Sequence, residues 1–289
     1  MDVIKQAIVD WLREILVGGI ISNLSGLYDS TNTRVAEIAG QIGTTPAAWN
    51  SSIYNMIRSL SDNVILPIAG VVLAFVMTLE LIQLIVDRNN MHDVDTWMFF
   101  KYFVKAWVAI YLVSNTFTIT MAVFDVGQSV VNSASGIING ETAIDVSSLS
   151  MQMQAAMATM EIGELVVLAL ETFLVSFCMK IMSVVITVIV YGRMIEIYLY
   201  TSLAPIPFAT MSNREWGHVG TNYFRGLFAL AFQAFLMMVC VAIYAALISS
   251  VRISSNMHSA LIGVAAYTVI LCFSLMKTGS LSKQIFGSH

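Results

Sequence analysis

The hydrophobic pattern of this chain is dominated by five long apolar stretches that contain few charges. Each is close to the length of about 20 residues that an α-helix needs to cross the hydrocarbon core of a bilayer. The pattern therefore predicts an all-α, polytopic membrane bundle of about five transmembrane helices. The stretches are Val64–Val86, Tyr102–Phe124, Leu165–Tyr191, Leu227–Ser249 and His258–Met276.

Composition supports the same class. Hydrophobic residues make up 57% of the chain and charged residues 11%, against about 25% charged in a typical soluble domain. Lys and Arg occur singly, without the clusters that mark a dedicated nucleic-acid surface. Cys178, Cys240 and Cys272 all fall inside apolar stretches. We interpret them as small core residues and expect neither a disulfide framework nor a zinc site.

The N-terminal region, residues 1–63, is predicted to hold interfacial helices. Apolar residues recur at helical spacing from Val3 to Leu16 and charged residues occupy the opposite face, which indicates an amphipathic helix. Such a helix can lie at the lipid–water interface or pack on its own bundle, and both alternatives stay open. Gly18-Gly19 is expected to weaken it, with two short helices following. Thr45 and Pro46 predict the capped start of the second, and Pro67 a kink at the start of the first span.

The distribution of basic residues between the spans predicts the orientation. Residues 125–163 contain no Lys or Arg, whereas the segment Asp87–Lys101, with Lys105 just beyond it, holds Arg88, Lys101 and Lys105. The positive-inside rule then places 125–163 outside as an external loop, with the N-terminus outside and the C-terminus in the cytoplasm. The predicted divisions are thus 1–63, 64–124, 125–163 and 164–289.

The segment Met194–Met211 is apolar but contains two prolines near its end. Pro205 and Pro207 remove two backbone donors, and at membrane depth this is tolerable only against protein or water. We therefore expect a helix break here, in a buried or re-entrant element that does not form a sixth full span.

The common catalytic motifs are not found in the sequence. It has no phosphate-binding loop of the GxxxxGK[ST] type, no GxSxG elbow, no HExxH and no CxxC. The nearest approach to a metal cluster is His92-Asp93-Val94-Asp95, which we interpret as a solvated or helix-capping loop. The sequence thus predicts a protein that is not an enzyme, with no catalytic residue, no metal site and no cofactor.

Ionisable side chains inside or beside the spans are the remaining candidate site residues. A charge at the centre of a span costs at least about 2.5 kcal/mol on insertion scales, so it normally faces a partner or water. These residues are Glu80, Glu171, Lys180, Arg193 and Glu196, with Lys101 and Lys105 at the start of the second span.

Two interpretations of these charges stay open. Glu171 and Lys180 could line an aqueous path or ion route, or they could pair across helices or between copies of the protein. The second interpretation is favoured. Arg193 and Glu196 are three residues apart on one helix and are expected to pair with each other.

Four sequence stretches resemble a known family. Tyr191–Gly217 reads YGRMIEIYLYTSLAPIPFATMSNREWG, a basic residue closing one helix followed by an apolar stretch with Ala-Pro and a polar turn. It resembles the TrbL-like polytopic inner-membrane subunit of type IV secretion (conjugal transfer) systems. Gly43–Trp49, His92–Phe99 and Lys277–Phe286 are similar to the branch found on mobile elements of Gram-positive bacteria.

The resemblance implies a multi-pass protein of the bacterial plasma (inner) membrane. It also implies a ring of several copies (a homo-oligomer) at the base of a pilus or channel, in contact with a secretion ATPase, bitopic scaffold subunits and membrane lipids. No individual functional residue is carried over.

The leading functional hypothesis is a non-enzymatic channel or scaffold subunit that helps pass single-stranded DNA and its attached protein across the membrane. The alternative is a small-solute or ion transporter that uses Glu171 and Lys180 near mid-membrane, with Pro205 and Pro207 breaking a helix at the site. A membrane-embedded enzyme is disfavoured because no nucleophile–base pair or metal set is found.

Overall fold

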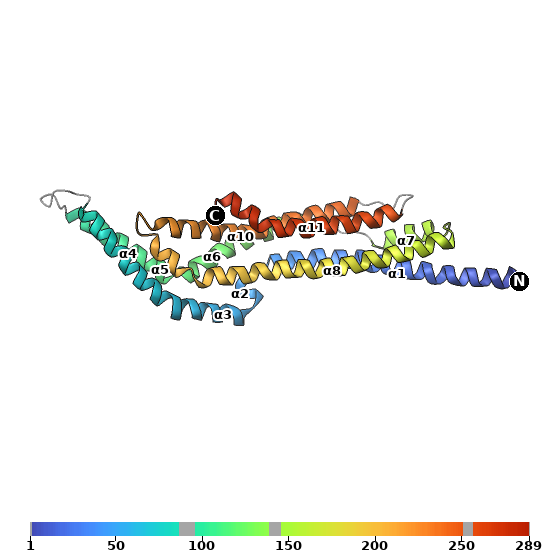
Figure 1. Ribbon diagram of the computed structural model, residues 1–289, viewed down its shortest axis with the longest axis horizontal. Coiled ribbons are helices and arrows are strands. Elements are labelled where there is room, and N and C mark those ends of the chain that lie inside the picture. The colour runs from blue at the N-terminus through green and yellow to red at the C-terminus, as the bar shows by residue number, and fades with distance from the viewer. Residues whose placement is uncertain (1, 87–95, 139–145, 251–256, 289) are drawn as a thin grey trace. The chain divides into compact units, whose positions relative to one another are not determined.

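The computed structural model describes residues 2–86, 96–138, 146–250 and 257–288, which are almost entirely helical and contain no strand (Figure 1). The helices are α1 (Asp2–Ile42), α2 (Pro46–Trp49), α3 (Ser51–Leu60), α4 (Leu66–Val86), α5 (Thr96–Ser114), α6 (Thr116–Ile138), α7 (Val146–Met157), α8 (Ile162–Ser202), α9 (Pro205–Thr210), α10 (Gly217–Ser250) and α11 (Met257–Phe286).

The predicted polytopic all-α architecture is confirmed. Within the described ranges, five helical segments are long and apolar enough to cross a membrane. Their outward faces carry many large apolar side chains, as expected where lipid is the solvent. The segments are Ser51–Val86, Trp97–Ser114, Ile162–Ser202, Gly217–Ser250 and His258–Phe286.

Contacts divide the chain into two compact units. Unit 1 comprises residues 1–42, 132–190 and 237–277, and unit 2 comprises residues 43–131, 191–236 and 278–289. Helices α8, α10 and α11 contribute residues to both units.

Unit 1 is built from α1, α7 and parts of α6, α8, α10 and α11. Helix α1 packs against α7, and Arg13 donates a hydrogen bond to the carbonyl of Ala158 at 2.8 Å. Figure 1 shows α1 running along the first part of α8. Tyr244 on α10 and Thr268 on α11 share a hydrogen bond of 2.9 Å, so hydroxyl groups tie these helices where both are buried.

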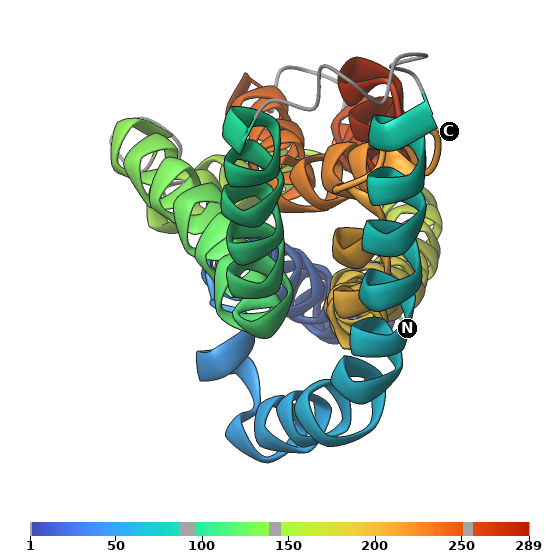
Figure 2. The same cartoon turned by 90° about the vertical axis from the view of Figure 1, so that its left-hand side faces the viewer.

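Unit 2 has two clusters of buried apolar side chains. One joins α3, α6, α8 and α10, with Phe117 and Leu230 among its members. The other joins α4, α5, α9 and α10, with Leu73 and Phe208 among its members. Helix α9 packs against both α4 and α5, and those two helices also contact each other. Figure 2 shows α3, in blue, leading into α4, in cyan.

The predicted amphipathic helix and the first of the two short helices that follow it form a single helix from Asp2 to Ile42, so the expected weakening at Gly18-Gly19 does not interrupt it. Each glycine costs a helix only about 1 kcal/mol relative to alanine. The buried side chains of Ile20, Leu24 and Leu27 continue the apolar stripe beyond the glycines. Tertiary packing of that stripe outweighs the local propensity.

The second predicted span, Tyr102–Phe124, is divided between α5 and α6 at Asn115. The Asn115 amide donates to the carbonyl of Tyr111 at 2.9 Å, and the Thr116 hydroxyl lies 2.9 Å from the carbonyl of Leu112. Such side-chain bonds to the preceding turn compete with the helical ladder and bend it.

The start of the first span follows the predicted turn chemistry. Thr45 accepts a hydrogen bond from the N–H of Ala48 at 3.1 Å and Pro46 is the first residue of α2, which confirms the predicted cap. Helix α3 continues into α4 through a π-helical turn at Ser61–Ile65, where the N–H of Leu66 bonds to the carbonyl of Ser61. Pro67 follows directly and has no backbone N–H to donate. The regular i to i−4 pattern of helical hydrogen bonds is therefore interrupted at this point.

One other segment differs from its expected local structure, and a second, Met194–Met211, contains the predicted helix break. Residues 125–163, expected to form a loop, contain the end of α6 and all of α7. Their helical form is favoured by apolar spacing, because Met153 and Met157 are buried one turn apart. In Met194–Met211, helix α8 continues to Ser202, and the chain turns at Leu203-Ala204 before α9.

Candidate functional site

The proline-containing break after α8 brings a polar turn of the chain to α4. Pro205 occupies the first position of α9, where its missing N–H costs no hydrogen bond. The turn between α9 and α10 contains Asn213, whose side chain is buried. Gly220 allows α10 to pass close to α9, because a Cβ there would lie 2.5 Å from the carbonyl oxygen of Pro207.

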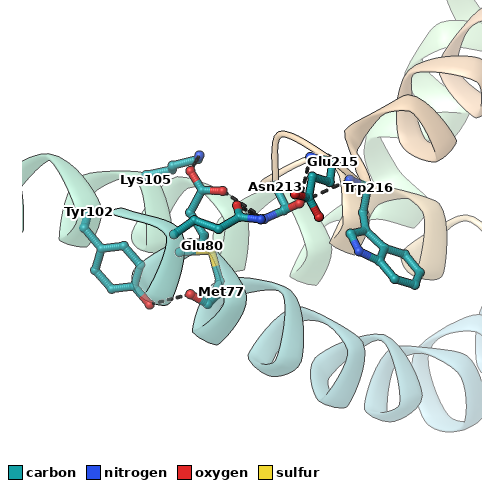
Figure 3. Close-up of polar contacts among 8 residues, drawn as sticks. Met77, Glu80, Tyr102, Lys105, Asn213, Glu215 and Trp216 are labelled. Atoms are coloured by element: carbon teal, nitrogen blue, oxygen red, sulfur yellow. Dashed lines mark hydrogen bonds and ion pairs between the residues drawn. The ribbon is translucent and has the colours of Figure 1, made fainter. Parts of the chain in front are cut away.

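Glu80, Gln83, Lys105 and Asn213 form a polar group that we call the Glu80 cluster (Figure 3). The Glu80 side chain is 14% exposed, and its Oε1 is hydrogen-bonded to the ammonium of Lys105 on α5. Its Oε2 accepts a hydrogen bond from Nδ2 of Asn213 at 3.0 Å. One carboxylate thus ties α4 both to α5 and to the turn before α10.

Asn213 uses both ends of its amide. Nδ2 also donates to Oε1 of Gln83 at 3.3 Å. Oδ1 accepts the backbone N–H groups of Glu215 at 2.8 Å and Trp216 at 3.1 Å. These bonds close the turn that starts α10, since the first N–H groups of a helix have no partner within it.

Two aromatic contacts flank the cluster on α5. The hydroxyl of Tyr102 donates to the carbonyl of Met77 at 3.1 Å and so adds a second link between α4 and α5 (Figure 3). Lys101 lies outside the cluster, and its ammonium is 5.8 Å from the ring centroid of Trp97 one turn away. The structure therefore brings Glu80 and Lys105 together and leaves Lys101 apart from them.

The electrostatics of the Glu80 cluster suit a helix-joining role. Glu80 and Lys105 carry opposite charges, so each offsets the cost of placing the other at membrane depth. Further donors from Asn213 satisfy the carboxylate, as a buried ionised group requires. The arrangement offers no nucleophile paired with a base, so its chemistry is that of an electrostatic and hydrogen-bonded tie.

The sequence predicts that Glu196 pairs with Arg193, but its carboxylate has a different hydrogen-bond partner. The Glu196 carboxylate instead accepts a hydrogen bond from Lys283 of α11 at 3.0 Å, with both side chains largely exposed. Arg193 is 7% exposed and donates to the carbonyl of Leu230 at 3.5 Å, while its Nε is buried without a partner. Arg193 points into the core of unit 2 and Glu196 to its surface, so three-residue spacing alone does not pair them.

Glu171 and Lys180 have separate surroundings in unit 1. The Glu171 carboxylate is bonded to Nδ1 of His258 at the start of α11, and both side chains are about one-third exposed. Lys180 instead borders a cavity between α1, α8, α10 and α11. The structure thus gives Glu171 an interhelical partner, and it does not join Glu171 to Lys180.

Sequence reasoning did not find Asn213, His258 or Lys283 as partners. Asn213 is 133 positions from Glu80, and His258 is 87 from Glu171. No local spacing signals such contacts. His92-Asp93-Val94-Asp95 lies outside the described residues, and within the described ranges no group of three His, Cys, Asp or Glu side chains could hold a metal ion. Cys178 is exposed on α8, so its assignment to the core is wrong, whereas Cys272 is buried.

The helical fold, with five apolar helices of membrane-spanning length in its described part, defines a multi-pass membrane protein. A sequence model of the TrbL/VirB6 plasmid conjugal transfer like family matches residues 31–205, more than half of the chain. The chain therefore belongs to this family, whose members are membrane subunits of type IV secretion machines. No curated protein and no solved structure matches the chain.

Proposed function

We propose that this protein is a non-enzymatic channel and scaffold subunit of a conjugative type IV secretion apparatus. In this role it helps pass single-stranded DNA and its attached protein across the bacterial plasma membrane. The observation that carries the proposal is the family match over residues 31–205 of a chain with five candidate spans in its described part.

Its partners in the proposed machine are further copies of itself, arranged in a ring, the secretion ATPase and bitopic scaffold subunits. Support comes from the family and from the extent of exposed apolar surface. Along α8 that surface includes Val166, Phe173, Val184 and Leu199. Surface of this kind can be covered by lipid or by a neighbouring transmembrane helix.

The proposed orientation has the N-terminus outside and the C-terminus in the cytoplasm. It rests on the absence of Lys and Arg from residues 125–163. A variant with Cys178, Cys240 and Cys272 replaced by Ser can carry either Asp10→Cys or Lys283→Cys. A membrane-impermeant maleimide added to intact cells should then label the Asp10→Cys protein and not the Lys283→Cys protein. Labelling of Lys283→Cys alone would contradict this orientation.

The function is tested by an in-frame deletion of the gene in a donor strain. Transfer should be abolished and restored by the plasmid-borne gene, while nicking of the DNA at its transfer origin continues. Transfer at the wild-type frequency from the deletion strain would overturn the proposal.

A second measurement separates the DNA-conducting role from a purely scaffolding one. Formaldehyde applied to conjugating cells should crosslink the transferred strand to this subunit, and a donor without the nicking enzyme serves as the control. Loss of transfer without any crosslinked DNA would leave the scaffold role and remove the channel role.

A further inference from the structure

A cavity of about 360 Å³ lies within unit 1, between α1 and the parts of α8, α10 and α11 that belong to this unit. Its volume and mainly apolar lining are those of small-molecule sites, which usually hold about 300–1,000 Å³ and a few placed polar groups. Its apolar wall includes Leu27 and Ile38 of α1, Met179 and Ile186 of α8 and Leu271 of α11.

The polar side of the cavity consists of hydroxyls and one cation. Ser176, Ser183 and Lys180 of α8 border it, and Ser22 and Asn23 of α1 face them. The Ser176 hydroxyl is buried without a hydrogen-bond partner. Among the described lining residues, Lys180 is the only charged one.

Lys180 itself needs a counter-charge. It lies on a candidate membrane-spanning helix, and no described residue forms a hydrogen bond or ion pair with its ammonium. A charge on a membrane-spanning helix normally faces a partner or water. An anion beside Lys180 would be such a partner, and the neighbouring hydroxyls could donate to its oxygens.

The position of Lys180 along α8 fits an amphipathic anion. Helix α8 has 41 residues, about twice the number required to cross the hydrocarbon core. Lys180 is close to the middle of the helix, so it can lie near the edge of the hydrocarbon. A lipid could then place its phosphate on Lys180 and an acyl chain along the apolar wall.

We propose that this cavity binds an acidic phospholipid whose phosphate group contacts Lys180 and the Ser176 hydroxyl. Inorganic phosphate shares the same anion chemistry but cannot use the apolar wall. Single-stranded DNA also carries phosphates, and it is the competing occupant that the test must separate. This proposal does not depend on the channel role, because lipid binding is measured on the purified protein.

The test is native mass spectrometry of the full-length protein in mild detergent. Phosphatidylglycerol, phosphatidylcholine with the same acyl chains, and inorganic phosphate are added separately. Phosphatidylglycerol should be retained most strongly. Lys180→Gln should reduce its retention about tenfold, because it removes the charged hydrogen-bond donor to the phosphate. Lys180→Arg should preserve it.

Two further variants distinguish charge, space and folding. Lys101→Gln removes a cation on α5, far along the chain from the cavity, and should leave lipid retention unchanged. Gly26 borders the cavity, and a Cβ there would meet nothing within 4 Å. Gly26→Leu should therefore occupy the space and lower retention while every charge stays in place. Circular dichroism should show wild-type helicity for both.

Four results would overturn the proposal. The first is equal retention of the two lipids, and the second is equal retention of phosphatidylglycerol by wild type and Lys180→Gln. The third is displacement of the lipid by a single-stranded oligonucleotide that binds wild type and not Lys180→Gln, which would assign the cavity to DNA. Retention of inorganic phosphate as strong as that of lipid would also contradict a lipid site.

Discussion

Tyr200 and Tyr223 each donate a hydroxyl hydrogen bond to the other's backbone carbonyl, at 3.0 and 2.8 Å. Their rings are stacked with centroids 4.4 Å apart and planes 10° from parallel. Tyr200 is near the end of α8 and Tyr223 near the start of α10. The pair therefore joins these two helices on either side of the segment that contains α9. Gly226 provides the space, because a Cβ there would lie 2.1 Å from the Tyr200 hydroxyl oxygen.

Replacing Tyr223 with Phe should lower the thermal stability of the protein in detergent. The change leaves the Tyr200 carbonyl without its donor, and hydrogen bonds within membrane proteins contribute about 0.6 kcal/mol on average. Tyr200→Phe should have a similar effect, and a double-mutant cycle should show that the two changes are not additive. Tyr111→Phe, at an exposed position on α5, is the control. Full additivity would mean that the two bonds act independently.

Gly220→Ala should destabilise the protein by roughly 1–3 kcal/mol, the usual cost of overpacking. The new methyl would meet Cγ of Met211 at 2.1 Å and the carbonyl oxygen of Pro207 at 2.5 Å, and the backbone atom has little freedom to move. Gly192→Ala is the matched control, because nothing lies within 4 Å of a Cβ there. The control should gain stability by up to about 1 kcal/mol from helix propensity. The two thermal midpoints should thus move in opposite directions.

Asn213→Ala should destabilise unit 2 more than Lys105→Met does. The first change leaves the Glu80 carboxylate and two backbone N–H groups short of partners, at about 1–3 kcal/mol for each buried group. The second removes a side chain that is 42% exposed. Thermal unfolding of the two variants in the same detergent measures the order. A larger loss for Lys105→Met would show that the ion pair, and not the amide, holds the cluster.

Arg193→Met should keep or raise thermal stability while conjugal transfer falls about tenfold. Replacing a buried, incompletely bonded charge by an apolar side chain of similar size is often neutral or stabilising. A charge retained in a membrane core at such a cost is by default a functional group. Lys283→Gln is the control, because it breaks an exposed pair with Glu196 and should change stability by only about 0–1 kcal/mol. Wild-type transfer by Arg193→Met would show that the arginine serves structure alone.

Glu171→Gln and His258→Gln should each weaken the contact between α8 and α11. The double variant should be no less stable than the less stable of the two single variants. The reason is that the two side chains are each other's partner in unit 1. Thermal midpoints of the four proteins measure the coupling. Solute uptake into proteoliposomes is measured alongside. Uptake that depends on Glu171 would support the transporter alternative in place of the structural role.

Much of the fold follows from the sequence because burial in lipid is a local requirement. Each span must be apolar over its whole length and must satisfy its own backbone hydrogen bonds, so the stretches around Val64–Val86 and Leu227–Ser249 are visible without tertiary information. The cap at Thr45 and Pro46 is equally local, since its donor and acceptor are three residues apart.

Helix lengths near the N-terminus and in the second span could not be predicted in this way. Gly18-Gly19 lies inside α1 because the apolar stripe beyond it is buried, and the second span is divided at Asn115, whose side chain bonds to its own preceding turn. Residues 125–163 have little charge and no long apolar run, so their helices become visible only with their packing partners.

The sequence by itself determined the class of protein, the number of candidate spans, the family resemblance and which ionisable residues lie in or beside the apolar stretches. Only the tertiary structure decided the partners of those residues. In the folded protein Glu80 is hydrogen-bonded to Lys105 and Asn213, Glu171 to His258, and Glu196 to Lys283. The physical reason is the sequence distance over which each requirement is met. The apolar length of a span is a property of one continuous segment. A charge in a low-dielectric interior is instead satisfied by whichever segment the fold brings within hydrogen-bonding distance.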